Sequence, residues 1–365
     1  MADHPLAPFD AVLLHSFGGP EGPEEVLPFL RRVTGGKGIP DERLREVGQH
    51  YDLFGGRSPI NELGRELARH LRAELADRGA EVPVTLGNRH SPPFTTDALA
   101  ELVAGGADHV VALRTSAWRS YSGCRSYREN LADALEDPRL DGLAVDQVSP
   151  YYASPGFAAT NAELVIDALA EALERDPDAR LLFVTHSIPD AMDLTSGPGE
   201  DEERDYSRAH AALGAAICDE ASRRLGREIT GELTFCSRSG PPTMAWLEPD
   251  VGDRIEELAA EGATSVVVAP IGFVSDHMEV IYDLDTEAAA TAERVGVRLV
   301  RVPTVGTDPR FVSGLADLLM DRAAMARGES PPPRSWAGLT VPPTPCAPGC
   351  CPNLREARPA LGDLR

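Results

Sequence analysis

One histidine in the sequence occupies a position from which it could do chemistry. The apolar run 180–186 ends in His186 and is followed by Ser187-Ile188-Pro189. The proline stops a strand and fixes the loop, since the residue before a proline avoids the helical region. An imidazole at such a strand end is suited to accept a proton or to ligate a metal. A histidine satisfied within the protein is the structural alternative.

A series of carboxylates follows a second apolar run, 264–270. Glu279, Asp283 and Glu287 are spaced by four residues, so a helix beginning at Asp276 would place them on one face. Like charges at this spacing destabilise a helix by roughly 0.2–0.5 kcal/mol per pair, and a solvated acidic face is the simpler interpretation. Because the series starts at a strand end beside an apolar loop, it also suits a path for a divalent cation or for protons.

His186 and Glu279 together offer one nitrogen and one oxygen donor. This pair is suited to Fe, Co, Ni or Zn, but two ligands are too few for a permanent structural zinc site. A metal held there would be in transit and would complete its coordination with ligands from another molecule.

A glycine turn follows the first apolar run and gives a rival interpretation. The segment His15-Ser16-Phe17-Gly18-Gly19-Pro20 could cradle phosphate before a helix. It lacks the third glycine of a dinucleotide fingerprint and the lysine of a P-loop, so the signal for a nucleotide-binding enzyme is weak.

The elements that must position these residues alternate along the chain. Short apolar runs, typical of strands, are separated by longer amphipathic patterns such as 60–78 and 309–326, and this order predicts parallel sheets covered on both faces. The predicted strands are 10–15, 82–86, 109–114, 143–148, 180–186, 232–235, 264–270 and 297–302. We therefore predict an α/β fold of two Rossmann-like domains, each with a four-stranded parallel sheet flanked by helices. The domains are residues 1–150 and 151–327, and residues 328–365 form a proline-rich, cysteine-containing irregular tail.

Charge and hydrophobicity exclude several classes of partner. The chain has 58 acidic and 35 basic residues, a net charge of −23, which repels nucleic acid and anionic membranes. The longest apolar stretch, 265–274, is too short to span a bilayer, and the first ten residues lack the features of a secretory leader. We expect a cytoplasmic monomer with no nucleic-acid partner and no stable membrane insertion.

Six motifs in order make the sequence resemble the ferrochelatases, which insert Fe²⁺ into a porphyrin. They are LLHSFGGPEGPEEVLPFLRRV, RLREVGQHYDLFGGRSPIN, SAWRSYSGCRSYREN, VTHSIP, CSRSGPPTMAWLEPD and PIGFVSDHMEVIYDLDTE. The resemblance implies two Rossmann-like domains with a porphyrin cleft between them. It implies that His186 is the catalytic histidine and iron contact, Glu279 the carboxylate beside it, and Asp283 and Glu287 the path by which iron arrives.

The same resemblance assigns residues on the porphyrin side. Ser58 and Tyr127 match positions at which coproporphyrin-type enzymes contact the propionates of the macrocycle. Phe17 departs from many Gram-positive members, which carry a tyrosine there, so axial ligation from that face is not expected.

The substrate implied is coproporphyrin III, with protoporphyrin IX as the alternative. SAWRSYSGC and SRSGPP resemble the actinobacterial members, which use the coproporphyrin route, and the chain lacks an apolar lip or amphipathic membrane helix. A chelatase for cobalt or nickel and a non-catalytic haem or porphyrin carrier are the other readings of the same motifs.

The tail carries Cys346, Cys350 and Cys351 within six residues. Some family members hold a [2Fe–2S] cluster with C-terminal cysteines and one cysteine from the body of the chain, and such a cluster needs four ligands. Related cluster-bearing enzymes place the body ligand in the loop after HSIP, where this chain has Thr195-Ser196-Gly197-Pro198. Cys124 is the substitute that we expect, and a tail without a cluster is the alternative.

Overall fold

Two separate parallel sheets form the framework of the molecule. The structure is a computed structural model that describes residues 4–35, 38–198, 204–240 and 243–363. Every strand lies within two residues of its predicted range. The first sheet has the order β2-β1-β3-β4 and is built from β1 (Ala11–Ser16), β2 (Val84–Asn88), β3 (His109–Arg114) and β4 (Ala144–Gln147). The second has the order β6-β5-β7-β8 and is built from β5 (Arg180–His186), β6 (Glu232–Cys236), β7 (Ser265–Ala269) and β8 (Arg298–Arg301).

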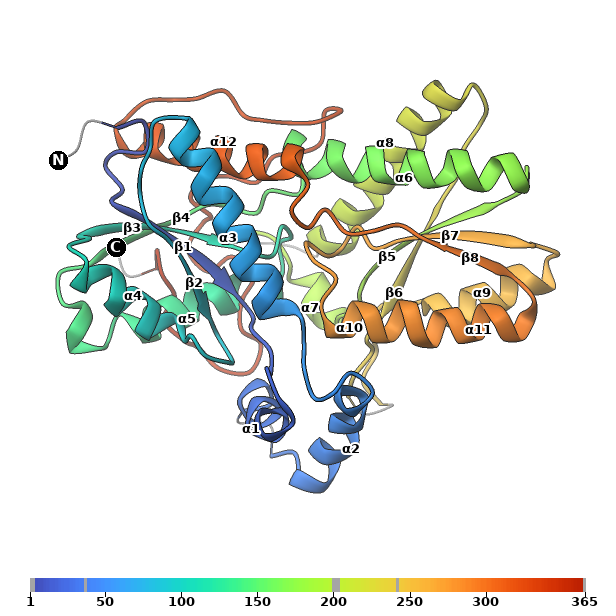
Figure 1. The fold of residues 1–365 in the computed structure, drawn as a ribbon, viewed down its shortest axis with the longest axis horizontal. Helices are drawn as coiled ribbons and strands as arrows, with labels where there is room; N and C mark the ends of the chain where they lie inside the picture. Colours follow the sequence, from blue (N-terminus) through green and yellow to red (C-terminus); the bar gives the residue numbers. More distant parts are fainter. Residues whose placement is uncertain (1–3, 36–37, 199–203, 241–242, 364–365) are drawn as a thin grey trace.

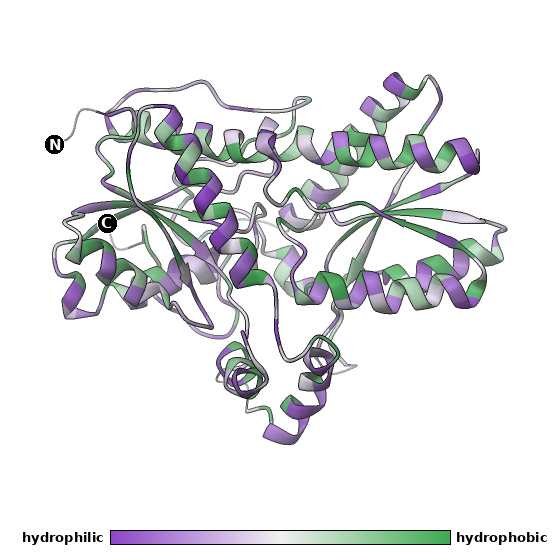
Figure 2. Cartoon of the chain, viewed as in Figure 1, coloured by the Kyte–Doolittle hydropathy of each residue, from purple (hydrophilic) through white to green (hydrophobic). Residues whose placement is uncertain are grey.

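Helices cover both faces of each sheet, as the predicted α/β fold requires (Figure 1). In the first half they are α1 (Pro23–Val33), α2 (Asp41–Asp52), α3 (Ile60–Asp77), α4 (Thr95–Ala104), the π-helix η1 (Tyr121–Arg125), α5 (Ser126–Ala134) and the 3₁₀-helix η2 (Pro138–Leu140). The second half contains α6 (Pro155–Arg175), α7 (Asp190–Leu194), α8 (Asp205–Leu225), α9 (Val251–Ala260), α10 (Met278–Val280), the π-helix η3 (Ile281–Ala288), α11 (Ala289–Val295) and α12 (Pro309–Ala326). The central strands β1, β3, β5 and β7 are mostly hydrophobic (Figure 2), because a parallel sheet with helices on both faces is buried on both sides.

The two halves share one hydrophobic core. Helix α12 ends the second half but packs on α3 of the first half as well as on α6. Helices α6 and α12 meet backbone to backbone, because a Cβ atom added at Gly156 would lie 2.5 Å from the Cα atom of Gly314. A single buried cluster continues from Leu71 in α3 through Phe157 in α6 to Phe311 in α12.

The helical pair α1–α2 projects from the two sheets (Figure 1) and has a small core of its own. Val26, Phe29, Leu30 and Leu44 pack together in a cluster separate from the main core. This pair is therefore anchored to the rest of the molecule by fewer apolar contacts than the other helices.

The tail is irregular, as predicted, and part of it is nevertheless buried. Residues 329–363 contain no helix or strand, yet all three tail cysteines are buried. Arg128, which is 1% exposed, donates to the carbonyl oxygen of Leu361 at 2.8 Å and pairs with Asp363 at 2.8 Å. The tail is held on both halves, because Cys351 bonds to Gly197 and Leu339 packs into the main core.

None of the helices in the described ranges combines the length and the hydrophobicity that a bilayer-spanning segment needs.

Candidate active site

His186 is the last residue of β5, a central strand of the second sheet. Its Nδ1 atom lies 2.5 Å from the carbonyl oxygen of Ser187. A carbonyl only accepts hydrogen bonds, so in the neutral ring Nδ1 carries the hydrogen and Nε2 keeps its lone pair. Nε2 lies 3.9 Å from Oε2 of Glu279, and 35% of the His186 side chain is exposed. The ring is held in the tautomer that can accept a proton or bind a cation on the Glu279 side.

The carboxylates lie on a helix whose type we predicted wrongly. Helical structure begins at Met278 rather than at Asp276, and after one short turn it becomes the π-helix η3. A π-helix closes i→i+5 hydrogen bonds, so four-residue spacing there does not have its α-helical meaning. Glu279, Asp283 and Glu287 nevertheless interact, because the charges of Glu279 and Glu287 both raise the pKa of Asp283.

Asp283 is the most perturbed of these carboxyl groups. Burial, and then the charge of Glu279, raise its pKa to about 6, against the opposing effects of Ser237 and His186. Its Oδ2 accepts a hydrogen bond from the hydroxyl of Ser237. A carboxyl group with this pKa gains and loses protons close to neutral pH.

Ser237 is a site residue that the sequence analysis missed. It directly follows β6, and its φ of +61° lies in the left-handed region that residues other than glycine rarely adopt. Backbone strain of this kind is concentrated at functional sites. The only sequence signal was its place in the CSRSGPP motif, whose glycine and prolines suggest a turn but not a hydroxyl aimed at Asp283.

The end of α2 faces the same π-helix. The ring of His50 stacks on that of Tyr282, with centroids 4.1 Å apart and an interplanar angle of 11°. The neighbouring Tyr51 has a raised pKa because it is buried and because the Glu279 carboxylate is close. The projecting α1–α2 pair thus reaches the acidic side of the site, a contact that the spacing of polar residues in α2 did not reveal.

Ser58 and Tyr127 belong to the first half of the chain, and both are buried. The guanidinium group of Arg89 lies 4.7 Å from the centroid of the Tyr127 ring and 5.8 Å from that of Phe17. Arg89 is half-buried, its Nε atom is shielded from solvent and has no hydrogen-bond partner, and burial lowers its pKa. A cation with an unused, shielded donor would suit a carboxylate ligand.

The Gly18-Gly19 turn is explained by close packing. A Cβ atom on Gly19 would lie 2.7 Å from side-chain atoms of Ser58 and Ile60, and one on Gly18 would lie 2.4 Å from Ser91 Oγ. Gly18 also has a φ of +83°. Both glycines are therefore required by their neighbours, and the turn gives the nucleotide alternative no support.

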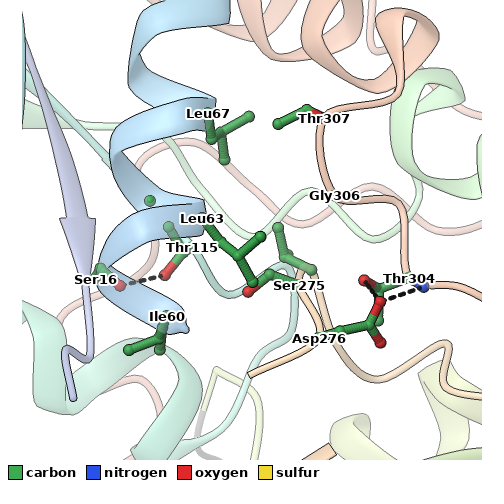
Figure 3. A pocket seen from close by; sticks show the side chains of 12 residues that line it. Ser16, Ile60, Leu63, Leu67, Thr115, Ser275, Asp276, Thr304, Gly306 and Thr307 are labelled. Carbon is green, nitrogen blue, oxygen red and sulfur yellow. Dashed lines mark hydrogen bonds between the residues drawn. The ribbon is translucent and has the colours of Figure 1, made fainter. Parts of the chain in front are cut away.

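A small cavity lies where the carboxyl ends of the two sheets meet (Figure 3). Its volume is about 120 Å³, and Ser16 and Thr115 from the first half line it together with Ser275, Asp276 and Thr304 from the second. This is smaller than the roughly 300–1,000 Å³ of sites for drug-sized ligands. The strand ends of both halves thus line one cavity, but this cavity is too small to hold a macrocycle.

Comparison with known proteins assigns the chain to a family. The ferrochelatase family model matches residues 9–323. The chain belongs to the ferrochelatase family. A coproporphyrin III ferrochelatase from Streptomyces coelicolor is 48% identical over 360 residues, covering 97% of this chain and 96% of that protein. One from Streptomyces griseus is 49% identical over 361 residues with the same coverage. The sirohydrochlorin chelatase SirB from Bacillus subtilis subspecies spizizenii, solved with cobalt, is 14% identical with a TM-score of 0.47, over 87% of this chain and 97% of that chain.

This ferrochelatase gathers four cysteines at one place, Cys124 from η1 and the three of the tail. The thiols of Cys350 and Cys351 are 3.7 Å apart, and Cys124 is hydrogen-bonded to Cys346. That hydrogen bond, followed by burial, raises the pKa of Cys124 well above its ordinary value. Neighbouring thiols in this group contact one another. In the described ranges, however, no three His, Cys, Asp or Glu side chains are already arranged to hold a metal ion.

Buried arginines lie beside these thiols. Arg114 is 3% exposed, and its Nε and Nη2 atoms lack hydrogen-bond partners, as does the Nε atom of Arg119. The positive charge of Arg114 lowers the pKa of Cys124 and Cys346, in part against the stronger effects that raise it. Unpaired guanidinium donors are costly to bury, and a group of thiolates would satisfy them. The four cysteines thus have the number and the donor type that a thiolate-bound cluster needs, although no three of them are arranged as metal ligands in the described ranges.

Proposed function

We propose that this ferrochelatase inserts ferrous iron into coproporphyrin III and forms Fe-coproporphyrin III for haem biosynthesis. The observation that carries the proposal is the pairing of His186 Nε2 with the Glu279 carboxylate, 3.9 Å apart, beyond the ends of neighbouring strands β5 and β7. The names of the Streptomyces relatives support the choice of coproporphyrin III over protoporphyrin IX.

Metallation replaces two pyrrole N–H protons with one Fe²⁺ ion, so the site must accept protons and supply a dication. His186 accepts the pyrrole protons one at a time at Nε2, because its Nδ1 hydrogen is committed to the carbonyl group of Ser187, and it releases each proton before it accepts the next. Glu279 binds the arriving iron and stabilises the imidazolium that forms. The total charge is unchanged, since two protons leave as one dication enters.

Asp283 and Glu287 form the path by which iron reaches Glu279. Hard divalent cations prefer carboxylate oxygen, and the charges of Glu279 and Glu287 both reach Asp283. Because the pKa of Asp283 is raised to about 6, this carboxyl group also passes on the protons released at His186.

Ser58 and Tyr127 contact the propionates of the macrocycle, and we add Arg89 as their cationic partner. The guanidinium group is held between the rings of Phe17 and Tyr127 with its Nε donor unused. Phe17 offers no atom for axial ligation, so it can only pack against the porphyrin face.

We further propose that Cys124, Cys346, Cys350 and Cys351 hold a [2Fe–2S] cluster, which would supply a one-electron redox centre. The buried thiols and the unpaired guanidinium donors of Arg114 and Arg119 support this proposal. Protein purified without oxygen should be brown, with roughly two irons per chain, as a Cys₄ cluster requires. Cys346→Ser should remove the colour, whereas the buried but distant Cys218→Ser should keep it. Colourless wild-type protein from iron-replete cells would contradict the proposal.

We also propose that the protein works as a cytoplasmic monomer. All six cysteines are free thiols, which suits a reducing compartment. Residues 1–150 and 151–327 then form the two walls of the porphyrin site. The tail, residues 328–365, packs its cysteines against them.

Anaerobic insertion of Fe²⁺ into coproporphyrin III and protoporphyrin IX, measured side by side, tests the function. We expect faster turnover with coproporphyrin III. Preference for protoporphyrin IX would overturn the substrate, preference for Co²⁺ or Ni²⁺ would overturn the metal, and tight porphyrin binding without insertion would indicate a carrier.

A further inference from the structure

Tyr206 contacts the strand end that carries His186. It is the second residue of α8 and is 5% exposed. Its hydroxyl donates to the carbonyl oxygen of His186 at 2.8 Å and lies 2.7 Å from the hydroxyl of Thr185. No part of the mechanism above uses this side chain.

The contact bears on the orientation of the imidazole. The peptide group between His186 and Ser187 is held on one side by Tyr206 and on the other by Cys236, whose carbonyl accepts from the Ser187 amide at 2.8 Å. The His186 ring is hydrogen-bonded to the carbonyl oxygen of Ser187. Rotation of this peptide group would therefore move Nε2 away from Glu279.

The position of Tyr206 depends in turn on the cysteine tail. The Tyr206 amide donates to the hydroxyl of Ser196 at 2.8 Å, and Ser196 is fully buried. The next residue, Gly197, contacts both the backbone and the sulfur of Cys351. Its carbonyl accepts from the Cys351 amide at 3.0 Å, and its own amide donates to the Cys351 sulfur at 3.3 Å.

A second set of contacts, through Arg119, connects the start of α8 beside Tyr206 with the cysteine tail. Arg119, buried between the halves, donates to Asp205 at 2.5 Å, directly before Tyr206. Burial lowers the pKa of Arg119, but the nearby Asp205 carboxylate and the tail cysteines, including Cys351, together outweigh burial and raise it. Cys351 itself has a φ of +53°, a strained value for a residue with a side chain, so the surrounding contacts force the tail into this place.

We propose that Tyr206 is a positioning residue for His186, and that the C-terminal tail fixes Tyr206 through Cys351, Gly197 and Ser196. The inference rests on the proposed role of His186 in metallation. The tail is then part of the machinery that aligns the proton acceptor, whether its thiols carry a cluster or not.

Tyr206→Phe tests the positioning role, because it removes one hydroxyl and keeps the buried ring. We expect kcat to fall about 10-fold, less than the ~10²-fold cost of a full 1 Å misplacement, with the KM values for iron and coproporphyrin III unchanged. Tyr151→Phe is the matched control. It removes another buried hydroxyl, which donates to the carbonyl oxygen of Arg114 at 3.0 Å, and it should lower the melting temperature similarly while keeping kcat.

A double-mutant cycle tests the link to the tail. Cys351→Ser alone should lower kcat, and in the Tyr206→Phe background it should lower kcat little further, because both changes act through one contact. Losses that multiply in the double variant would overturn the link. If Tyr206→Phe does not fold, Ser196→Ala takes its place in the cycle.

Two further outcomes separate this inference from the proposed function. A wild-type protein that inserts no iron into coproporphyrin III would overturn the function and the inference with it. Active wild type together with an unchanged kcat in Tyr206→Phe would overturn the inference alone.

Discussion

The two halves of the molecule each carry a histidine near the end of the corresponding strand. β1 and β5 hold the same place in sheets of the same order, β2-β1-β3-β4 and β6-β5-β7-β8. His15 is the penultimate residue of β1, and His186 is the last residue of β5. His15 is 1% exposed, its Nε2 lies 2.9 Å from Oδ1 of Asn130, and its ring meets Tyr127 edge to face.

The difference between these histidines lies in their neighbours. Burial lowers the pKa of His15 to about 3, so this ring stays neutral and its Nε2 is already bonded. His186 is partly exposed and has a carboxylate beside a free Nε2. A strand end supplies position, whereas an open nitrogen and an acidic neighbour supply the chemistry.

The largest expected effect comes from removing the imidazole of His186. His186→Ala should lower iron insertion by ~10²-fold or more, the usual contribution of a general base. Coproporphyrin III should still bind, because other side chains hold the macrocycle. Insertion assays and porphyrin fluorescence titration check this, and activity above a tenth of the wild-type rate would disprove the assignment.

The acidic neighbour gives the next effect. Glu279→Gln should reduce kcat far more than Asp283→Asn, because only Glu279 lies beside the His186 nitrogen. Asp283→Asn should mainly raise the apparent KM for iron, as should Glu287→Gln. Steady-state kinetics over a range of Fe²⁺ concentrations separates the two parameters. Equal losses of kcat in all three variants would argue against a path that ends at one carboxylate.

His15, whose Nε2 is already hydrogen-bonded, should matter for stability rather than for catalysis. His15→Ala removes a buried hydrogen bond to Asn130 and should lower the free energy of unfolding by about 1–3 kcal/mol. The folded fraction should keep an insertion rate of the wild-type order. Urea unfolding and activity measured on the same samples test this, and a rate as low as that of His186→Ala would remove the contrast between the two strands.

The buried histidines His15 and His210 should make the free energy of unfolding depend on pH in the acid range. Burial lowers the pKa values of both His15 and His210 to about 3, so between pH 6.5 and 3 the unfolded chain binds more protons than the folded one. Stability is therefore complete above pH 6.5 and falls on acidification, by up to ~1.4 kcal/mol per pH unit for each histidine. Asp283, whose pKa is raised, opposes this trend below pH 6.

Unfolding in urea at several pH values between 7.5 and 5 measures this slope. His210→Gln should flatten it, because His210 is fully buried and stacks on Trp118 at 3.3 Å between centroids. An identical slope in wild type and variant would show that this histidine does not titrate on unfolding.

The framework was predictable because its signals are local. Short apolar runs between amphipathic patterns predicted all eight strands, and the sequence pointed to His186 and Glu279 because the first ends such a run and the second follows one. The π-helix was not predictable, since the segment 276–287 fits an α-helical pattern equally well and only its packing decides the hydrogen-bond register.

Site contacts made by residues from distant parts of the chain could not be predicted from the sequence either. His50 and Tyr51 reach the π-helix only because α1–α2 projects toward it. Ser237 needed its strained backbone to meet Asp283. The tail lacks apolar periodicity, so its burial through Arg128 and the cysteines depends on contacts that no local pattern encodes.

The contact between Gly156 and Gly314 makes the long axis of the molecule mechanically stiff. Two helices that touch backbone to backbone leave no side-chain layer that could slide, and pulling the halves apart would expose the shared core around Phe157 and Phe311 to water. The α1–α2 pair, by contrast, buries its apolar residues in a small separate core, so displacing it as a unit would leave the shared core covered.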